Sequence, residues 1–319
     1  MMGQLIINEW AKLFRRTGTL VMIGLVVLLV FGVAGVFKYD EIKNPPQENP
    51  QWKQALEQQI KDDTVALEGV GKKNANMKMY LERTIAINQY KVEHNIAPDS
   101  NKNVWLFVRD AEQILSFVGI FVIVVAAGMV SSEFSWGTVK LLLIRPISRM
   151  KILLSKYLTV ILFGLMLLAC LFILSWIAGV IFFGLPEGTT SHLAYVGGEV
   201  VERNIVVQLI VEYLLSSIDL LMLATMAFMI SAVFRNSNLA IGLALFLMFM
   251  GQTATMLLAA KFEWAKYILF ANTNLTVYFD GVPPVESMTL TFSIVMLIVY
   301  FLAFHMLSFT VFAKRDVAS

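Results

Sequence analysis

The chain contains little charge and almost no cysteine. Only 15% of its 319 residues are charged and 58% are hydrophobic, a composition that excludes an ordinary soluble domain and places the chain in a bilayer. The net charge of +2 gives no reason to expect nucleic-acid binding. The single cysteine, Cys170, excludes an intrachain disulfide, and its position inside an apolar run indicates a small buried hydrophobe.

Motifs for nucleotide hydrolysis and for hydrolytic or metal chemistry are also missing. The segment 69–72, Gly-Val-Gly-Lys, has neither the spacing nor the following Ser or Thr of a phosphate-binding loop. The three histidines, His94, His192 and His305, lie far apart, and neither H-E-x-x-H nor G-x-S-x-G occurs. We therefore expect no catalytic residue, metal site or cofactor in this chain, which is not an enzyme by itself.

Long uncharged runs are the main positive signal. A helix needs about 20 mostly apolar residues to cross a bilayer, and each run meets that length. The first run follows basic residues but is longer than the apolar region of a signal peptide, so we interpret it as an uncleaved span. The sequence predicts an all-α integral membrane protein, 1–319 forming a single transmembrane domain, with six transmembrane helices at 17–37, 110–131, 157–183, 205–234, 239–260 and 288–313.

Basic residues near the ends of these spans gather on one side. An even number of spans places both termini on the same side, and positively charged flanks mark the cytoplasmic side. We therefore predict a multi-pass protein of the plasma membrane with both termini in the cytoplasm. The basic residues on that side are Lys12, Arg15, Arg16, Lys140, Arg145, Arg149, Lys151, Lys156, Arg235, Lys314 and Arg315.

Residues 1–16 have the pattern of an amphipathic helix lying in the cytoplasmic headgroup plane. Apolar residues recur near helical spacing, with Trp10 at the membrane boundary, and the basic residues lie near anionic lipid. The polar positions between the apolar ones are Glu9, Lys12, Arg15 and Arg16.

The long outer segment, 38–109, predicts an extracellular helical hairpin. Apolar residues recur every three or four positions from Trp52 to Leu67 and again from Met77 to Val92, with glycines between the two stretches. The two other outer connections, between Phe183 and Ile205 and over 261–287, are predicted to be irregular or partly re-entrant.

Polar residues inside the spans are costly and are functional candidates. Gln208, Glu212, Ser216 and Asp219 follow helical spacing on one face of the fourth span, and His305 lies in the sixth. They line a translocation path or gate, or they form a buried interhelical hydrogen-bond network. The sequence leaves both interpretations open.

The loop 132–156 is the most informative stretch, and with its flanks it reads SSEFSWGTVKLLLIRPISRMKILLSKY. It resembles the signature of permease subunits of bacterial type-2 ATP-binding-cassette (ABC) exporters, of the bacitracin- or lantibiotic-resistance-like kind. The N-terminal pattern of Glu9, Lys12, Arg15 and Arg16 and the six spans resemble that family too. The resemblance rests on Glu133, Gly137-Thr138, Leu141 to Leu143, Pro146, Ser148-Arg149 and Lys156.

The resemblance implies a four-part assembly. Two copies of a separate cytosolic ATPase would hold ATP and Mg, and a second permease copy or homologue would complete the path for an antimicrobial or amphipathic peptide or a lipid. A short coupling helix in the loop would dock on the ATPase, its apolar residues packing into a cleft with an acidic rim. The coupling residues would be Glu133, Gly137, Thr138, Leu141, Leu142, Pro146 and Arg149.

Other interpretations stay open at this point. The loop could be a basic collar that only sets topology. Glu133 could pair with a nearby arginine, form an ion pair with the N-terminal helix, or act as a hinge. The whole chain could also be an ion-coupled secondary transporter that depends on Asp219, or a ligand-sensing membrane scaffold.

Overall fold

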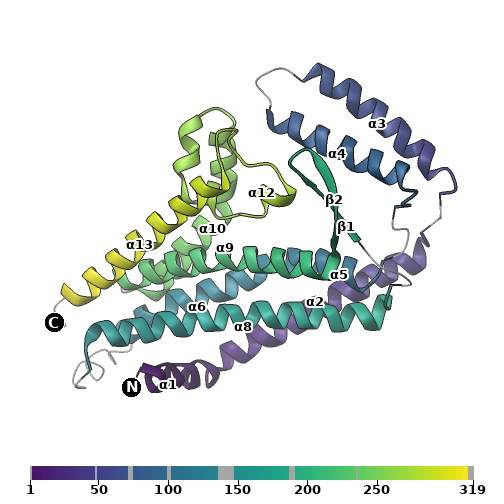
Figure 1. Ribbon diagram of the computed structural model, residues 1–319. Coiled ribbons are helices and arrows are strands. Elements are labelled where there is room, and N and C mark those ends of the chain that lie inside the picture. Colours follow the sequence, from purple (N-terminus) through teal and green to yellow (C-terminus); the bar gives the residue numbers. More distant parts are fainter. Residues whose placement is uncertain are drawn as a thin grey trace.

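The computed structural model describes residues 2–46, 49–70, 75–98, 102–135, 147–186, 191–234 and 236–314, which are almost entirely helical (Figure 1). Six helical segments among these residues are long and apolar enough to cross a membrane. This confirms the predicted all-α membrane fold. The segments are α2 (Thr17–Lys43), the run α5 (Val104–Asp110), η1 (Ala111–Ile114) and α6 (Leu115–Ser135), α8 (Arg149–Phe183), α9 (Ile205–Phe234), α10 (Ser237–Ala259) and α13 (Leu290–Lys314).

Helices α6 and α9 form the centre of the bundle, and α2, α10 and α13 lie at its periphery. The peripheral helices are apolar all round, so they leave large side chains uncovered. Leu28 of α2, Phe246 of α10 and Met306 of α13 are each more than half exposed. A continuous apolar surface of this kind is the surface that a bilayer covers.

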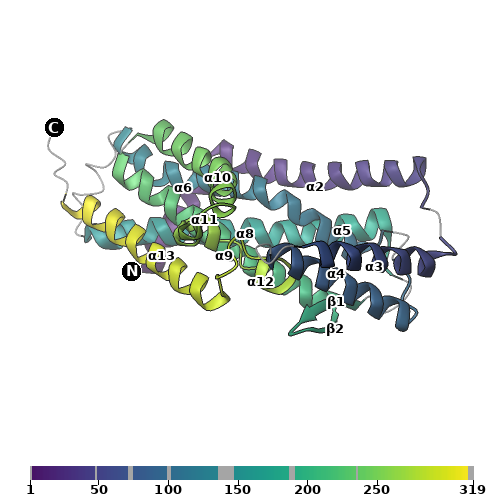
Figure 2. The same cartoon turned by 90° about the horizontal axis from the view of Figure 1, so that it is seen from above.

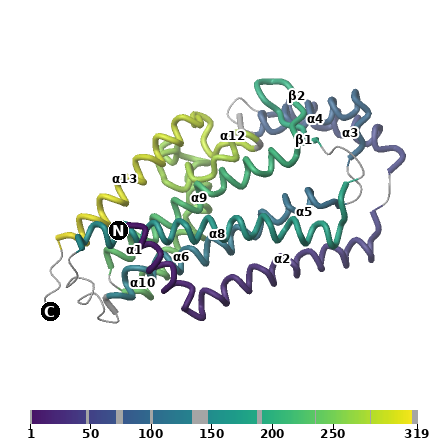
Figure 3. Tube along the Cα trace, turned by 60° about the horizontal axis from the view of Figure 1, so that its bottom comes forward, coloured from purple at the N-terminus to yellow at the C-terminus, as the bar shows by residue number. Residues whose placement is uncertain are grey.

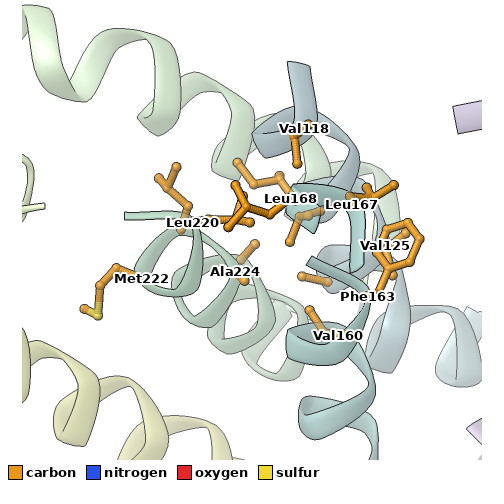
Figure 4. Packing of buried hydrophobic residues seen from close by; sticks show 14 of the residues in the cluster. Val118, Val125, Val160, Phe163, Leu167, Leu168, Leu220, Met222 and Ala224 are labelled. Carbon is orange, nitrogen blue, oxygen red and sulfur yellow. The ribbon is translucent and has the colours of Figure 1, made fainter. Parts of the chain in front are cut away.

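The core lies where α6, α8 and α9 meet (Figure 4). Phe163 and Leu167 of α8 are fully buried there, beside Val125 of α6 and Ala224 of α9. The helices approach closely at Gly164, where a Cβ atom would lie 3.4 Å from Leu220 Cδ2. Small residues at such crossings allow tight packing where no hydrophobic effect drives association.

The N-terminal helix α1 (Met2–Phe14) packs along the first turns of α8, as expected of an amphipathic helix. Trp10 lies against Phe14, with ring centroids 4.9 Å apart, and Phe14 meets Phe163 edge-on at 6.5 Å. The Thr19 hydroxyl donates a hydrogen bond to the Leu13 carbonyl at 2.7 Å, which fixes the bend between α1 and α2.

The two ends of the bundle differ. Helix α1 and the end of α13 lie at one end, which we call the terminal end (Figures 1 and 3). Helices α3 (Trp52–Gly69) and α4 (Ala75–Glu93) lie at the other, the hairpin end, and pack on each other as the predicted helical hairpin (Figure 2).

The connection between α8 and α9 is a β-hairpin, so the prediction of an irregular connection there is wrong. Strands β1 (Ser191–Val196) and β2 (Glu199–Asn204) pair antiparallel. Gly197 and Gly198 form the two-residue turn with φ of 64° and 96°, the positive values that such hairpin turns require. Tyr90 of α4 reaches this hairpin through a 3.4 Å hydrogen bond to Glu202.

The connection after α10 consists of short helical pieces. These are η2 (Glu263–Tyr267), α11 (Leu269–Asn272) and α12 (Val277–Asp280). Asn272 holds them to α13: its amide donates to the Lys266 and Ile268 carbonyls at 2.8 and 2.9 Å, and its carbonyl accepts from the Ser293 hydroxyl at 2.8 Å.

Candidate functional site

A buried ion cluster joins three helices at the terminal end. The Lys156 ammonium of α8 lies 2.7 Å from Glu9 Oε2 of α1 and 2.8 Å from Glu133 Oε1 of α6. Lys12, one helical turn after Glu9, adds a 2.8 Å contact to Glu9 Oε1. Only 3% of the Lys156 side chain is exposed, so this lysine lies inside the protein. We call Glu9, Lys12, Glu133 and Lys156 the terminal-end ion cluster.

The local sequence explains how these charges become buried. Glu9 lies one helical turn before Leu13, on the face of α1 that packs against α8, so burying Leu13 buries Glu9 as well. Leu153 and Tyr157 flank Lys156 in the core. Burial by itself would raise the pKa of the Glu9 carboxyl, but the ammonium groups of Lys156 and Lys12 outweigh it and hold that pKa below its ordinary value.

Two members of the cluster lie at the two ends of the predicted coupling loop, 132–156. Glu133, at the start of this range, is near the end of α6, and Lys156, its last residue, is in the first turns of α8. Arg149, at the start of α8, donates a hydrogen bond to the Ala313 carbonyl of α13 at 3.3 Å. The other predicted coupling residues lie outside the described residues: Gly137, Thr138, Leu141, Leu142 and Pro146.

The structure shows the contacts of Glu133 and the exposure of the residues predicted for the N-terminal helix. Glu133 pairs with Lys156, and this lysine links it to the N-terminal helix. Glu9 is buried, whereas Lys12 on the same helix and Arg15 in the turn after it are exposed, and Trp10 is half-buried. Lys156 was one of many basic residues in the sequence, and no local signal distinguished it as the centre of the cluster.

The polar face of α9 is held by hydrogen bonds at its hairpin end. Arg203 of β2 donates to the Gln208 side chain at 3.2 Å, and Gln208 donates to Glu212 at 2.9 Å. One turn further, the Ser216 hydroxyl donates to Glu112 of η1 at 2.9 Å. These bonds tie α9 to its own β-hairpin and to the start of α6.

A cavity of about 260 Å³ opens beyond Ser216, between α6, α9, α10 and α11. Asp219 lies in its wall and so does Ser216, whereas Gln208 and Glu212 do not. Glu112 was not among the predicted polar residues, although a carboxylate within the predicted span 110–131 was a visible signal. The lining residues are Glu112, Leu115, Ser116, Gly119, Leu215, Ser216, Asp219, Leu220, Leu223, Met248, Phe249, Gln252, Phe270, Thr273, Asn274 and Thr276.

His305 lies away from this cavity, in the seam between α13 and α8. Its Nδ1 is 2.9 Å from the Phe301 carbonyl, and its ring meets Tyr157 edge-on at 4.5 Å. The Tyr157 hydroxyl is in turn 2.8 Å from the Thr225 hydroxyl of α9. His305 therefore takes part in interhelical packing and does not meet Asp219.

Comparison with known proteins identifies the family of this chain. The sequence profile described as "Protein of unknown function (DUF2705)" matches residues 75–318. The chain is similar to the uncharacterized protein YhcI of Bacillus subtilis (strain 168), with 48% identity over 320 residues and the full length of both chains covered. It is also similar to the uncharacterized membrane protein YdbK of the same organism, with 33% identity over 198 residues, 61% of this chain and 76% of the relative. A profile match over most of the chain, together with a relative alike from end to end, shows that the protein belongs to the DUF2705 family.

Proposed function

We propose that the chain is the membrane-spanning permease subunit of an ATP-driven ABC exporter. It lies in the plasma membrane with the terminal end in the cytoplasm and the α3–α4 hairpin outside. Two copies of a separate ATPase subunit bind ATP and Mg and dock on the terminal end, and a second permease copy or homologue completes the path. The resemblance of the segment 131–157 and the six spans support this proposal.

The observation that carries the proposal is the placement of the terminal-end ion cluster. A coupling loop has to pass a push from the ATPase to the spans on both of its sides. Lys156 binds a carboxylate at the end of α6 and another on α1, so α1, α6 and α8 are joined directly at the loop. Removing one partner of a buried ion pair costs about 3–5 kcal/mol, and the three helices therefore move together when the loop is displaced.

The cargo follows from the resemblance alone. We propose an antimicrobial or amphipathic peptide, or a lipid. The exposed apolar faces of α2, α10 and α13 are compatible with cargo that enters from the bilayer.

Co-purification tests the proposal. The tagged chain is extracted from native membranes in mild detergent, its partners are identified by mass spectrometry, and vanadate-sensitive ATP hydrolysis is measured. A variant with Leu141, Leu142 and Arg149 changed to Ala is expected to lose the ATPase subunit. A matched triple-alanine variant at Ile42, Lys43 and Leu185, exposed positions at the hairpin end, is expected to retain it. Absence of any nucleotide-binding partner from the unaltered chain contradicts the proposal.

Asp219 in the cavity wall favours a second candidate, an ion-coupled secondary transporter. The two candidates differ in what transport requires. An exporter stops when the partner's ATP hydrolysis is abolished, whereas a secondary transporter continues without hydrolysis and stops when an ion gradient is dissipated.

A further inference from the structure

We infer that the exposed face of α10 is the surface on which a second copy of this chain docks. The inference rests on the proposed function only for the requirement of a second permease subunit. It adds which face is used and that the partner is identical. Two observations carry it: polar side chains that are uncovered within the span, and a cavity that opens on the same face.

The exposed residues of α10 form one stripe along the helix. Gly242, Phe246, Phe249, Thr253 and Met256 are all exposed and recur at the spacing of a seam between two packed helices. Nothing lies within 4 Å of a Cβ position at Gly242, so a partner helix can approach closely there. Helices α6 and α9 pack on the opposite side of α10, which lies at the edge of the bundle (Figure 2).

Two polar side chains lie uncovered on this face. Gln252 and Thr253 are exposed, and neither side chain forms a hydrogen bond with another described residue. Thr255, on the other side of the helix, shows the contrast: it is buried, and its hydroxyl donates to the Gly251 carbonyl at 2.7 Å. The stripe therefore carries an amide and a hydroxyl that the chain itself does not satisfy.

The depth of Gln252 makes this costly. The residue lies seven positions before the end of α10, which is about 10 Å inside the helix at a rise of about 1.5 Å per residue. The exposed rings of Phe262 and Trp264, which follow the helix, are typical of a membrane boundary. At this depth lipid offers an amide no hydrogen bond, and an unpaired amide in an apolar environment is unfavourable.

The two other peripheral helices carry no such groups in their middle parts. Positions 20–36 of α2 contain no polar side chain. The polar side chains at positions 294–309 of α13 are Tyr300, His305 and Ser308, and each lies 2.7–2.9 Å from a backbone carbonyl oxygen. Lipid alone therefore suits the exposed faces of α2 and α13, whereas α10 calls for a polar partner.

A second copy supplies that partner. A glutamine amide carries both a donor and an acceptor, and in a pair with twofold symmetry a residue near the axis faces its own counterpart. The two Gln252 amides are thus able to donate to each other and accept from each other across an α10–α10 contact. This complementarity of the face with itself favours an identical chain over an acyl chain.

The cavity between α6, α9 and α10 opens on the same face. Phe249 and Gln252 line it and are also exposed. Its wall contains the polar side chains of Ser216, Asp219 and Asn274, so without a partner its mouth would meet acyl chains. A second copy docked on α10 covers the mouth and brings the two cavities to face each other across the symmetry axis. A path shared by two permease copies requires this arrangement.

Cysteine cross-linking in native membranes tests the inference. Cys170 is first changed to Ala, which leaves the full-length chain without cysteine, and one cysteine is then introduced on the stripe as Phe249→Cys or Thr253→Cys. The controls are Val36→Cys on α2 and Ile298→Cys on α13, which are exposed and lie seven and eight residues from the ends of their helices that face away from the terminal end.

Oxidation with membrane-permeant copper phenanthroline should give a reducible dimer of twice the monomer mass from at least one stripe variant. Each control should give about one-tenth as much or less, because a disulfide requires Cα atoms within about 7 Å of each other. Every variant is first compared with the unaltered chain by elution volume and melting temperature, so that only folded proteins are compared.

A second measurement tests the amide. Gln252→Leu removes it without hindering insertion into a bilayer, and energy transfer between labelled copies in liposomes, followed on dilution with lipid, measures dimerisation. We expect dimerisation to weaken by about three- to tenfold, the size expected for one or two hydrogen bonds between membrane helices. Thr291→Val, which removes an exposed hydroxyl from α13, is the matched control and should leave dimerisation unchanged.

The outcomes that overturn the inference are distinct. Absence of a dimer from both stripe variants does so, and so does equal or stronger cross-linking through Val36→Cys or Ile298→Cys. A stripe variant that forms its disulfide with a different polypeptide shows a non-identical partner. Dimerisation unaffected by Gln252→Leu also overturns the inference, because the uncovered amide assigns the face.

The cross-linking result is separate from the proposed ATPase coupling. If an ATPase subunit co-purifies while the stripe yields no dimer, this inference fails alone. If the stripe yields the dimer while no nucleotide-binding partner is found, the exporter proposal fails and the dimer stands.

Discussion

Lys156 and Glu9 form a 2.7 Å ion pair although 147 positions separate them in the chain. The pair joins the N-terminal helix to α8 at the end of the bundle where the loop 132–156 begins and ends. The same ammonium holds Glu133, so one residue links three helices.

Replacing Lys156 by Met should destabilise the protein strongly. The change removes the buried ammonium that Glu9 and Glu133 both contact and leaves Glu9 with the more exposed Lys12. Breaking a buried ion pair in this way costs about 3–5 kcal/mol. Reversible unfolding of the reconstituted protein measures this loss. The control is Lys151→Met on the exposed side of the same helix, where we expect a change within about 0.5 kcal/mol. Similar losses for the two variants would show that the cluster does not stabilise the fold.

Neutralising Glu9, Glu133 and Lys156 together should recover part of the stability that Lys156→Met loses. The triple variant Glu9→Gln, Glu133→Gln and Lys156→Met contains no buried charge at this point, and replacing a buried ion cluster by neutral groups is often close to neutral in stability. Its unfolding free energy should lie above that of Lys156→Met. A triple variant less stable than the single one contradicts the view that the loss arises from buried carboxylates deprived of Lys156.

The pH dependence of stability should include a contribution from Glu9. Its pKa in the folded protein is lowered, because the attraction of Lys156 and Lys12 outweighs the burial of the carboxyl group. The unfolded state therefore binds the proton more readily, and the contribution of Glu9 is complete above its ordinary pKa of 4.5 and is lost as the pH falls below that value.

Melting temperature measured between about pH 3 and 7 tests this. The stability of the unaltered chain should fall more steeply below pH 4.5 than that of Glu9→Gln, which cannot take up this proton. Parallel curves for the two proteins would contradict the assignment.

Gly179 should tolerate no larger side chain. A Cβ atom there would lie 2.9 Å from Val104 Cγ2 and 3.1 Å from the Val104 backbone, so α5 would have to move away from α8. Gly179→Ala should cost about 1–3 kcal/mol. Gly32→Ala on α2 is the matched control, since nothing lies within 4 Å of its Cβ position, and alanine there should be neutral or up to about 1 kcal/mol stabilising.

The parts of the fold that could be predicted from the sequence carry local signals. The six spans are long apolar runs, and α1, α3 and α4 repeat apolar residues at helical spacing. The β-hairpin also had a local signal, since Gly197 and Gly198 stand between two extended stretches. The connection is short, and it was therefore predicted to be irregular.

The site depended on tertiary packing and could not be predicted in the same way. Positive-inside placement already explained Lys156, so nothing in the sequence indicated that it is buried between Glu9 and Glu133. The spacing of Gln208, Glu212, Ser216 and Asp219 predicted one polar face of α9. The structure divides this face into two parts. Gln208, Glu212 and Ser216 take part in side-chain hydrogen bonds, the last of them to Glu112 of η1, and beyond Ser216 the face becomes the wall of the cavity that Asp219 lines.

Site-specific photo-cross-linking in living cells tests the ATPase coupling most directly. A photoreactive phenylalanine analogue replaces Leu142 in the proposed coupling helix, and in a control protein it replaces Leu185, an exposed apolar residue at the hairpin end. We predict that position 142 yields an adduct with a polypeptide that carries a phosphate-binding loop, identified by mass spectrometry, and that position 185 yields none. Absence of such an adduct at position 142, in cells where the protein is inserted and folded, would contradict the assignment as an ABC exporter permease.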